Sequence, residues 1–454
     1  MSAAEALSLE DTILYVLETN PDIKAAEANK QAIEFELEQA RNFYAPKIEL
    51  EAWGGSSRNQ GTATPDLGAA SSAVSGYEIS GRISQMLFDG WQTRSEIERQ
   101  AYRIDAAAYR VLERSEVLSL EAVRLYSDVL RSQRLLKLAR DNLAYHQDVF
   151  ARLKTGFDRG VIGIGDLNQA EERVVLAQDT ILEFELNYED VKTLFLATVG
   201  VEARNLGSVP NIGASVPSVL DNAIAKARNT NPTIRFLQSD VGSAEALSRR
   251  VNANQYPELT LEADGRYGDD VGGFEGRRQD GRVGLVLRYE FQGGYKRAVR
   301  QEHVRRVGES RARLLSQTRL VEREVRQSWS TLRSAQRRLK TIDAQARLSR
   351  RLRETYEEEY VVGTRSLLDV LNTQNALFQA EANLINAQSL ESYVKYRLLA
   401  SIGILLPTLG IEPPEDSRAY AKERIGAPEL SSDGVDDQLD ARTFRDWRKS
   451  VENK

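Results

Sequence analysis

Residues 356–381 read YEEEYVVGTRSLLDVLNTQNALFQAE, a helical pattern that is interrupted once, by VVGTRS, and then resumes. A matching interruption occurs earlier, in FDRGVIGIGDLNQAEERVV at residues 157–175. Gly160 and Gly363 are 203 residues apart, and each is followed six residues later by an aspartate. Internal repeats of this kind determine the architecture. The sequence therefore predicts two copies of one helical hairpin, each with a glycine at its turn.

The repeat covers most of the chain. The helix-starting pair Asn20-Pro21 matches Asn231-Pro232, and PKIELEAWG matches PELTLEADG 211 residues later. Between these blocks and the hairpins the offset falls to 203, which indicates a deletion of eight residues in a loop. We predict a first copy over residues 1–205, a linker over 206–218, a second copy over 219–410, and an acidic, Pro-containing C-terminal tail over 411–454.

Each copy contains two segments in which apolar and polar residues alternate. In RVGLVLRYEF, for example, Val, Leu, Leu, Tyr and Phe alternate with mostly polar residues. Alternation over about ten residues predicts half-exposed β-strands. The loops within each pair are rich in Gly, Ser and Asp. The expected strands are residues 47–56 and 77–88 in the first copy and 258–267 and 282–291 in the second.

Long helices follow each pair of strands. A helix of such length needs a partner, so we expect each to pair with its own return helix as an antiparallel coiled coil. The turns are expected at residues 156–165 and 359–366. The junctions between strands and helices are expected at Pro46, Gly90, Pro257 and Gly293.

The composition excludes several classes of function. The 454 residues carry 61 basic and 67 acidic side chains, a net charge of −6, so nucleic-acid binding is not supported. The absence of Cys excludes disulfides and thiolate metal sites. The only histidines, His146 and His303, lie among charged residues of the long helices, and no nucleophile–base or phosphate-binding motif accompanies them. We therefore expect no enzyme activity, no cofactor and no metal site.

Four strands per chain cannot close a barrel, yet their length suits a lipid bilayer. A barrel in lipid must close, because every backbone polar group needs a partner there. Closure then requires two or, more plausibly, three chains around an axis. The sequence thus favours a membrane barrel assembled from several copies. The remaining apolar runs are too short for a membrane-spanning helix.

The chain resembles the TolC family of bacterial outer-membrane channels, used in type I protein secretion and multidrug efflux. The resemblance covers residues 7–410 and is most specific in YVVGTRSLLDVLNTQ, GVIGIGDLNQAE, LFDGW, FQGGY and the two NP pairs. It implies an α+β membrane protein, a trimer with a 12-stranded transmembrane β-barrel, four strands per chain, continued by a long antiparallel coiled-coil α-helical tunnel across the periplasm. It also implies a mature chain without its signal peptide, located in the outer membrane.

The resemblance also implies roles for residues at the hairpin turns. Tyr360 and Arg365 would form a latch between hairpins near Asp166, and Asp369 would line the narrowest point of the tunnel. Two departures stand out. Asn372 occupies the place of a second acidic residue of the constriction, and Gly165 stands where a hydroxyl residue is usual. The tips that would contact an adaptor include Gly160, Val161, Gly363 and Thr364, with Arg159 and Ser366 beside them.

The expected partners are two further copies of the chain, a periplasmic adaptor, an inner-membrane transporter, outer-membrane lipid and the exported cargo. The FDGW and FQGG motifs and the lack of Cys favour the type I secretion branch over drug efflux. A soluble periplasmic adaptor or scaffold built on coiled coils is the remaining alternative. The tail is expected to be poorly ordered or draped on the outside of the tunnel, since it has few apolar residues.

Overall fold

The computed structural model describes residues 6–59, 72–271 and 276–428. These residues form two compact units, and neither unit coincides with one of the two sequence copies. Each unit instead combines corresponding segments of both copies. The first unit comprises Met1–Ala28, Ala108–Phe236 and Ser316–Arg418, and the second comprises Asn29–Ala107, Leu237–Leu315 and Ala419–Lys454.

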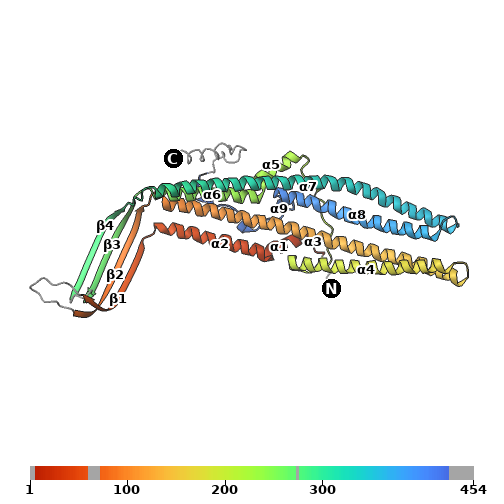
Figure 1. The fold of residues 1–454 in the computed structure, drawn as a ribbon, viewed down its shortest axis with the longest axis horizontal. Helices are drawn as coiled ribbons and strands as arrows, with labels where there is room; N and C mark the ends of the chain where they lie inside the picture. The colour runs from red at the N-terminus through yellow and green to blue at the C-terminus, as the bar shows by residue number, and fades with distance from the viewer. Residues whose placement is uncertain (1–5, 60–71, 272–275, 429–454) are drawn as a thin grey trace, which may run out of the picture. The chain divides into compact units, whose positions relative to one another are not determined.

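The second unit contains one four-stranded antiparallel sheet in the order β1-β2-β3-β4 (Figure 1). Strands β2 and β3 come from different copies, so their pairing joins the two predicted strand pairs into one sheet. The last strand does not cover 282–291 as predicted. It ends at Arg288 because Arg288 pairs with Glu258, the first residue of the neighbouring strand. The strands are β1 (Lys47–Asn59), β2 (Ser72–Phe88), β3 (Glu258–Asp269) and β4 (Arg277–Arg288).

The principal helices are α1 (Leu9–Thr19), α2 (Pro21–Arg41), α3 (Gln92–Asp158), α4 (Ile164–Val199), α5 (Leu220–Thr230), α6 (Pro232–Ala253), α7 (Tyr295–Val361) and α8 (Leu367–Ile402). The short elements are η1 (Asn42–Tyr44), η2 (Gly213–Ser215), α9 (Leu405–Thr408), η4 (Glu415–Ser417) and α10 (Ala421–Arg424). None of the helices in the described ranges has an apolar stretch long enough to cross a membrane.

The two NP pairs perform the same structural task in the first unit. The amides of Asn20 and Asn231 donate to the carbonyls of Thr198 and Ser401, at 3.3 and 3.0 Å. Their side-chain oxygens accept backbone N–H groups at the start of the following helix, at 2.9 and 3.0 Å. In each copy, therefore, a single asparagine caps the following helix and also fixes it to the end of the return helix of the same copy.

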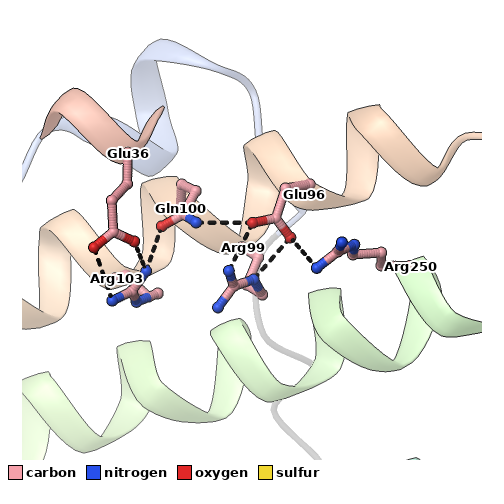
Figure 2. A network of polar contacts seen from close by, with 6 residues as sticks. All are labelled: Glu36, Glu96, Arg99, Gln100, Arg103 and Arg250. Carbon is pink, nitrogen blue, oxygen red and sulfur yellow. Dashed lines mark hydrogen bonds and ion pairs between the residues drawn. The ribbon is translucent and has the colours of Figure 1, made fainter. Parts of the chain in front are cut away.

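A polar network joins α2, α3 and α6 in the second unit (Figure 2). Glu96 is 5% exposed and accepts hydrogen bonds from Arg99 at 2.6 and 2.8 Å and from Gln100 at 2.8 Å. Arg250 of α6 lies 3.1 Å from the same carboxylate, and an ion pair extends the network to α2. Burial acts to raise the pKa of Glu96, but these donors outweigh it and the pKa is lowered. The carboxylate thus stays ionised and ties α3 to α6.

The beginning of the tail is docked rather than loose. Within the second unit, Ala421 is 1% exposed and packs in an apolar cluster with residues of α2 and α3. The buried carboxylate of Asp105 accepts the backbone N–H groups of Ala421, at 2.8 Å, and Lys422, at 3.1 Å. Of the two alternatives expected for the tail, poorly ordered or draped, this stretch is not poorly ordered, because a buried carboxylate on α3 satisfies its backbone. Residues 429–454 lie outside the described residues.

Glu116 of α3 is another buried carboxylate, and it lies in the first unit. It is 4% exposed and accepts the backbone N–H groups of Leu405, at 3.1 Å, and Leu406, at 3.3 Å. Burial raises its pKa from 4.5 to about 7, although the two hydrogen bonds act in the opposite direction. The folded chain therefore holds a proton at Glu116 over a pH range in which the unfolded chain has released it.

This difference makes stability depend on pH with a defined sign. Since the folded-state pKa is the higher one, the stability that the proton contributes is present below pH 4.5 and is lost as the pH rises to about 7. The loss is on the order of 3 kcal/mol. We expect the thermal unfolding temperature to decrease when the pH is raised from 5 to 8. Circular dichroism of the protein in detergent would measure it.

The Glu116→Gln variant should lose most of this pH dependence. The matched control is Glu113→Gln, one turn earlier on the same helix, where the carboxylate is half-exposed and accepts from the Thr233 hydroxyl at 3.0 Å. The control should retain the wild-type slope. Equal slopes in the wild-type chain and Glu116→Gln would contradict the assignment.

Candidate functional site at the ends of the helical hairpins

Both hairpin turns use the same backbone motif. Gly160 and Gly363 have φ values of +76° and +80°, the left-handed region that a residue with a Cβ disfavours. The N–H of each glycine donates to the carbonyl three residues earlier, at 2.8 and 3.0 Å. The N–H of the next residue donates to the carbonyl five residues earlier, at 3.0 and 2.9 Å. This pair of bonds is the Schellman motif, which explains why a glycine occupies both turns.

The two return helices begin differently. Helix α8 is capped by Ser366, whose hydroxyl accepts the N–H of Asp369 at 3.2 Å and donates to its carboxylate at 2.8 Å. Helix α4 begins after Gly163, which has no side chain to cap it. The first hairpin therefore lacks a helix-capping contact that the second has.

An apolar cluster joins the two hairpins near their turns, which lie at the same end of the first unit (Figure 1). At its centre Leu371 of α8 is fully buried, and Leu153 of α3 and Ala170 of α4 pack in the same cluster. Tyr360, the proposed latch residue, packs against this cluster from α7. The side chains of one chain thus already fix its two hairpins to one another.

The structure brings Tyr360 and Asp166 into the same electrostatic environment. Burial raises the pKa of the Tyr360 phenol, and the negative charge of Asp166 raises it further. Asp166 itself is exposed in the first turn of α4. Within one chain, these two predicted latch residues therefore lie near enough to interact electrostatically.

Arg365 is held by its own hairpin. Its guanidinium donates to Glu359 at 2.6 Å and lies over the ring of Tyr356, 4.2 Å from the ring centre. The hydrogen bond to Glu359 raises the pKa of Arg365. Among the described residues, the side chain of Arg365 pairs with Glu359 and not with Asp166, so the third latch residue is not brought to the other two in a single chain.

The predicted constriction residues lie on successive turns of α8. Asp369 is half-buried and its carboxylate takes part in the Ser366 cap, whereas Asn372 is exposed. Asp369 thus has a local structural role besides the one predicted for it.

The two faces of the sheet differ sharply. Since side chains alternate along a strand, the pairing of Ile48 with Ile83, Ile83 with Ala263, and Ala263 with Val283 puts these residues on one face. That face is apolar and exposed; Leu50, for example, is 81% exposed. The opposite face carries a row of alternating charge across all four strands, Glu49, Arg82, Asp264 and Arg282, in which both arginines pair with Asp264 at 3.2 and 2.9 Å.

Comparison with known proteins decides the family. The family model of the outer membrane efflux proteins matches residues 13–194 and 223–402, the greater part of both copies. The chain belongs to the outer membrane efflux protein family. The resemblance to the TolC family is thereby confirmed, and the family consists of membrane channels rather than enzymes.

Individual relatives match the chain over most of its length. The outer membrane efflux protein BepC of Brucella suis is 22% identical over 93% of this chain and 92% of its own. Outer membrane protein TolC of Vibrio cholerae is 24% identical over 85% of this chain and 88% of its own. The alkaline protease secretion protein AprF of Pseudomonas aeruginosa is 23% identical over 88% of this chain and 85% of its own.

The fold matches that of solved channels in the family. The CmeC outer membrane channel of Campylobacter jejuni superposes with a TM-score of 0.76, at 15% identity, over 94% of this chain and 90% of that one. The predicted fold class, long helical hairpins with a four-stranded antiparallel sheet in each chain, is confirmed.

The hairpin tips expose apolar residues that were not predicted from the sequence. Val361 and Val362 are 82% and 73% exposed, and Ile164 on the other hairpin is 57% exposed, beside the predicted Val161 at 75%. The signal was present in the sequence, since two adjacent β-branched residues end an otherwise polar helix. The tips therefore offer an apolar surface and not only turn geometry.

The predicted junction residues lie where strands meet helices. Pro46 and Pro257 directly precede β1 and β3, while Gly90 and Gly293 have positive φ values of 67° and 51° between a strand and the following helix. A Cβ at Gly90 would lie 2.7 Å from a backbone oxygen. The next residue, Trp91, also has a positive φ, of 68°, and its ring packs edge-on against two neighbouring aromatic rings. Side-chain packing thus holds this junction in an unfavourable backbone conformation.

Proposed function

We propose that three copies of this chain form a channel-tunnel in the bacterial outer membrane that extends into the periplasm and exports substrates. The exposed apolar face of the sheet carries this proposal. Seven side chains on that face are 48–81% exposed: Ile48, Leu50, Ile79, Ile83, Val283, Leu285 and Leu287. In water such a face would be unfavourable, whereas lipid solvates it.

The opposite face suits an aqueous lumen. Its alternating charges form ion pairs between neighbouring strands, and water can solvate the rest. An apolar face and a charged face on one sheet are typical of a transmembrane barrel, and a barrel must close. Three chains of four strands give a closed barrel of 12 strands.

The assembly has a direct test. Lysine-reactive cross-linking of the protein in detergent should give a trimer and no larger species, and the trimer should fractionate with outer membranes. A monodisperse monomer that stays in solution without detergent would contradict the proposal and would favour a soluble adaptor or scaffold.

For the cargo we propose the type I secretion branch, in which the channel serves an inner-membrane transporter and exports protein. The FDGW and FQGG motifs and the similarity to the secretion protein AprF support this. Multidrug efflux is the competing function, because the family and BepC are both described as efflux proteins.

Deletion of the gene separates the two branches. Loss of a secreted protein from the culture medium, with unchanged drug susceptibility, is the expected result. Sensitisation to several drugs with intact protein secretion would favour efflux instead. Complementation with the wild-type chain should reverse either phenotype.

The proposed partner surface lies at the hairpin tips. The exposed valines at 161, 361 and 362 and the two glycine turns fit an adaptor whose own helical tips present apolar side chains. The adaptor would in turn link the channel to the inner-membrane transporter.

A further inference from the structure

The sheet of one chain contains the information needed to infer the register between β4 of that chain and β1 of the next. Within the described part of the chain, the sheet ends at β1 on one side and β4 on the other, so these two strands are its edges. The four strands alternate in direction, so β4 of one chain is antiparallel to β1 of the next. The inference below rests on the proposed trimeric barrel and asks which residues meet at its three seams.

The strand ends show how the sheet is staggered. Gly54 lies in one row with Tyr77, Asp269 and Arg277, the first residue of β4, and β1 continues five residues beyond Gly54 to Asn59. At the other end, Lys47 lies in one row with Ser84, Glu262 and Gly284, and β4 continues four residues beyond Gly284 to Arg288.

A stagger of four to five residues therefore accumulates over three strand pairs. In a closed barrel the strand ends lie at one level and every pair contributes to the stagger, because the strands tilt by about 35–45°. If the seam, as a fourth strand pair, adds the same stagger as each of the other three, one chain accumulates a shift of about five to seven residues between its own row and the row of the next chain. This shift must be an even number of residues, because an odd shift would move apolar side chains to the charged face. The shift that satisfies both conditions is six.

A shift of six sets Glu49 of one chain opposite Arg288 of the next. It also sets Leu50 opposite Leu287 on the lipid face. A shift of four would instead oppose Lys47 to Arg288, a like-charge pair. The charges along the two edges therefore exclude the shorter shift, and the strand stagger excludes a shift of eight.

Both members of this pair are available. The side chains of Glu49 and Arg288 are 48% and 56% exposed. Arg288 already pairs with the buried Glu262 of its own chain, and Glu49 with Lys47 of its own strand. A guanidinium has enough donors for a second carboxylate. We propose that each seam of the barrel is held in register by an ion pair between Glu49 and the Arg288 of a second copy, with Leu50 against Leu287 on the outside.

Cysteine cross-linking tests the register, since the chain has no native Cys. In the double variant Leu50→Cys/Leu287→Cys the two residues would face each other across a seam at a Cα separation of about 4.5–5.5 Å, within reach of a disulfide. Within one chain, β2 and β3 lie between the two strands and separate the two residues by more than about 14 Å, so only a seam can be bridged. Mild oxidation in outer membranes should give a covalent trimer on non-reducing denaturing gels.

The matched control is Leu50→Cys/Leu285→Cys, in which the second position is moved by two residues on the same face. This variant should stay monomeric on the same gel. Each single-cysteine variant should likewise give no covalent trimer. A covalent trimer from the control pair, and none from the first pair, would overturn the register of six. Absence of both disulfides in a chain that lysine-reactive reagents cross-link as a trimer would overturn it too, while leaving the proposed function intact. Absence of any trimer would reject both.

The ion pair has its own test in the Leu50→Cys/Leu287→Cys background. Adding Glu49→Lys sets a cation against Arg288, and we expect the yield of covalent trimer to fall severalfold. The control is Glu51→Lys, which makes the same charge reversal on the same face of β1. The register sets position 51 opposite Val286, so this variant should reduce the yield far less. Equal losses in the two variants would show that Glu49 has no specific partner.

Discussion

The double variant Arg365→Ser/Tyr360→Phe should raise the single-channel conductance severalfold in a planar lipid bilayer. Tyr360 lies half-buried at the cluster that joins the two hairpins, beside the charge of Asp166. Arg365 is exposed enough to reach a neighbouring chain, although in its own chain it binds Glu359. Contacts that involve a charged group contribute about 1.5–3 kcal/mol each, less where water reaches them. Three symmetric sets of such contacts would keep the closed state dominant.

Glu359→Gln is the control that separates two roles of Arg365. If the arginine only stabilises its own turn, losing its carboxylate partner should open the channel as Arg365→Ser does. If it acts between chains, as we propose, the Glu359→Gln channel should stay at low conductance. Unchanged conductance in the double variant itself would reject the latch.

The charge that we predict at the constriction is tested in the same recordings. Three copies of Asp369 around the axis should favour cations in transit, so Asp369→Asn should lower the cation selectivity and weaken block by multivalent cations. Asp369 also belongs to the helix cap of α8, and Ser366→Ala removes that cap without changing the charge. A selectivity change of equal size in both variants would trace the effect to the cap rather than to the charge.

Gly363→Val should reduce export to background while leaving the trimer assembled. The glycine has a φ of +80°, and a residue with a Cβ costs about 1–2 kcal/mol there, more when it is β-branched. A Cβ at this position would meet nothing within 4 Å, so the effect would come from the backbone and not from a clash. The turn would change shape at the surface where we expect the adaptor to bind.

Gly363→Asn is the matched control, because asparagine tolerates the left-handed conformation. It should retain most of the export activity, measured as secreted protein per cell, with trimer content verified by cross-linking. A complementary variant, Val362→Asp, keeps the turn and replaces an exposed apolar side chain with a charge. Full export in both Gly363→Val and Val362→Asp would show that the adaptor binds elsewhere.

The sequence by itself determined the features that depend on local geometry. The glycines at 160 and 363 indicated left-handed turns because few other residues adopt that conformation, and both turns have it. Alternation of apolar and polar residues indicated strands, since each strand of this sheet has two unlike faces. The ends of the strands were less well predicted. The predicted range of β4 was displaced at both ends, because a strand ends where its partner strand ends and not where its own apolar–polar alternation stops.

The tertiary structure alone decided the contacts between distant segments. No local pattern distinguishes Glu116 or Asp105 from the many other acidic residues of the long helices, yet both are buried and bind backbone N–H groups some 290 and 316 residues away. The pairing of β2 with β3 is of the same kind. A carboxylate's protonation and an edge strand's register depend on what surrounds them, and those surroundings exist only once the chain has folded.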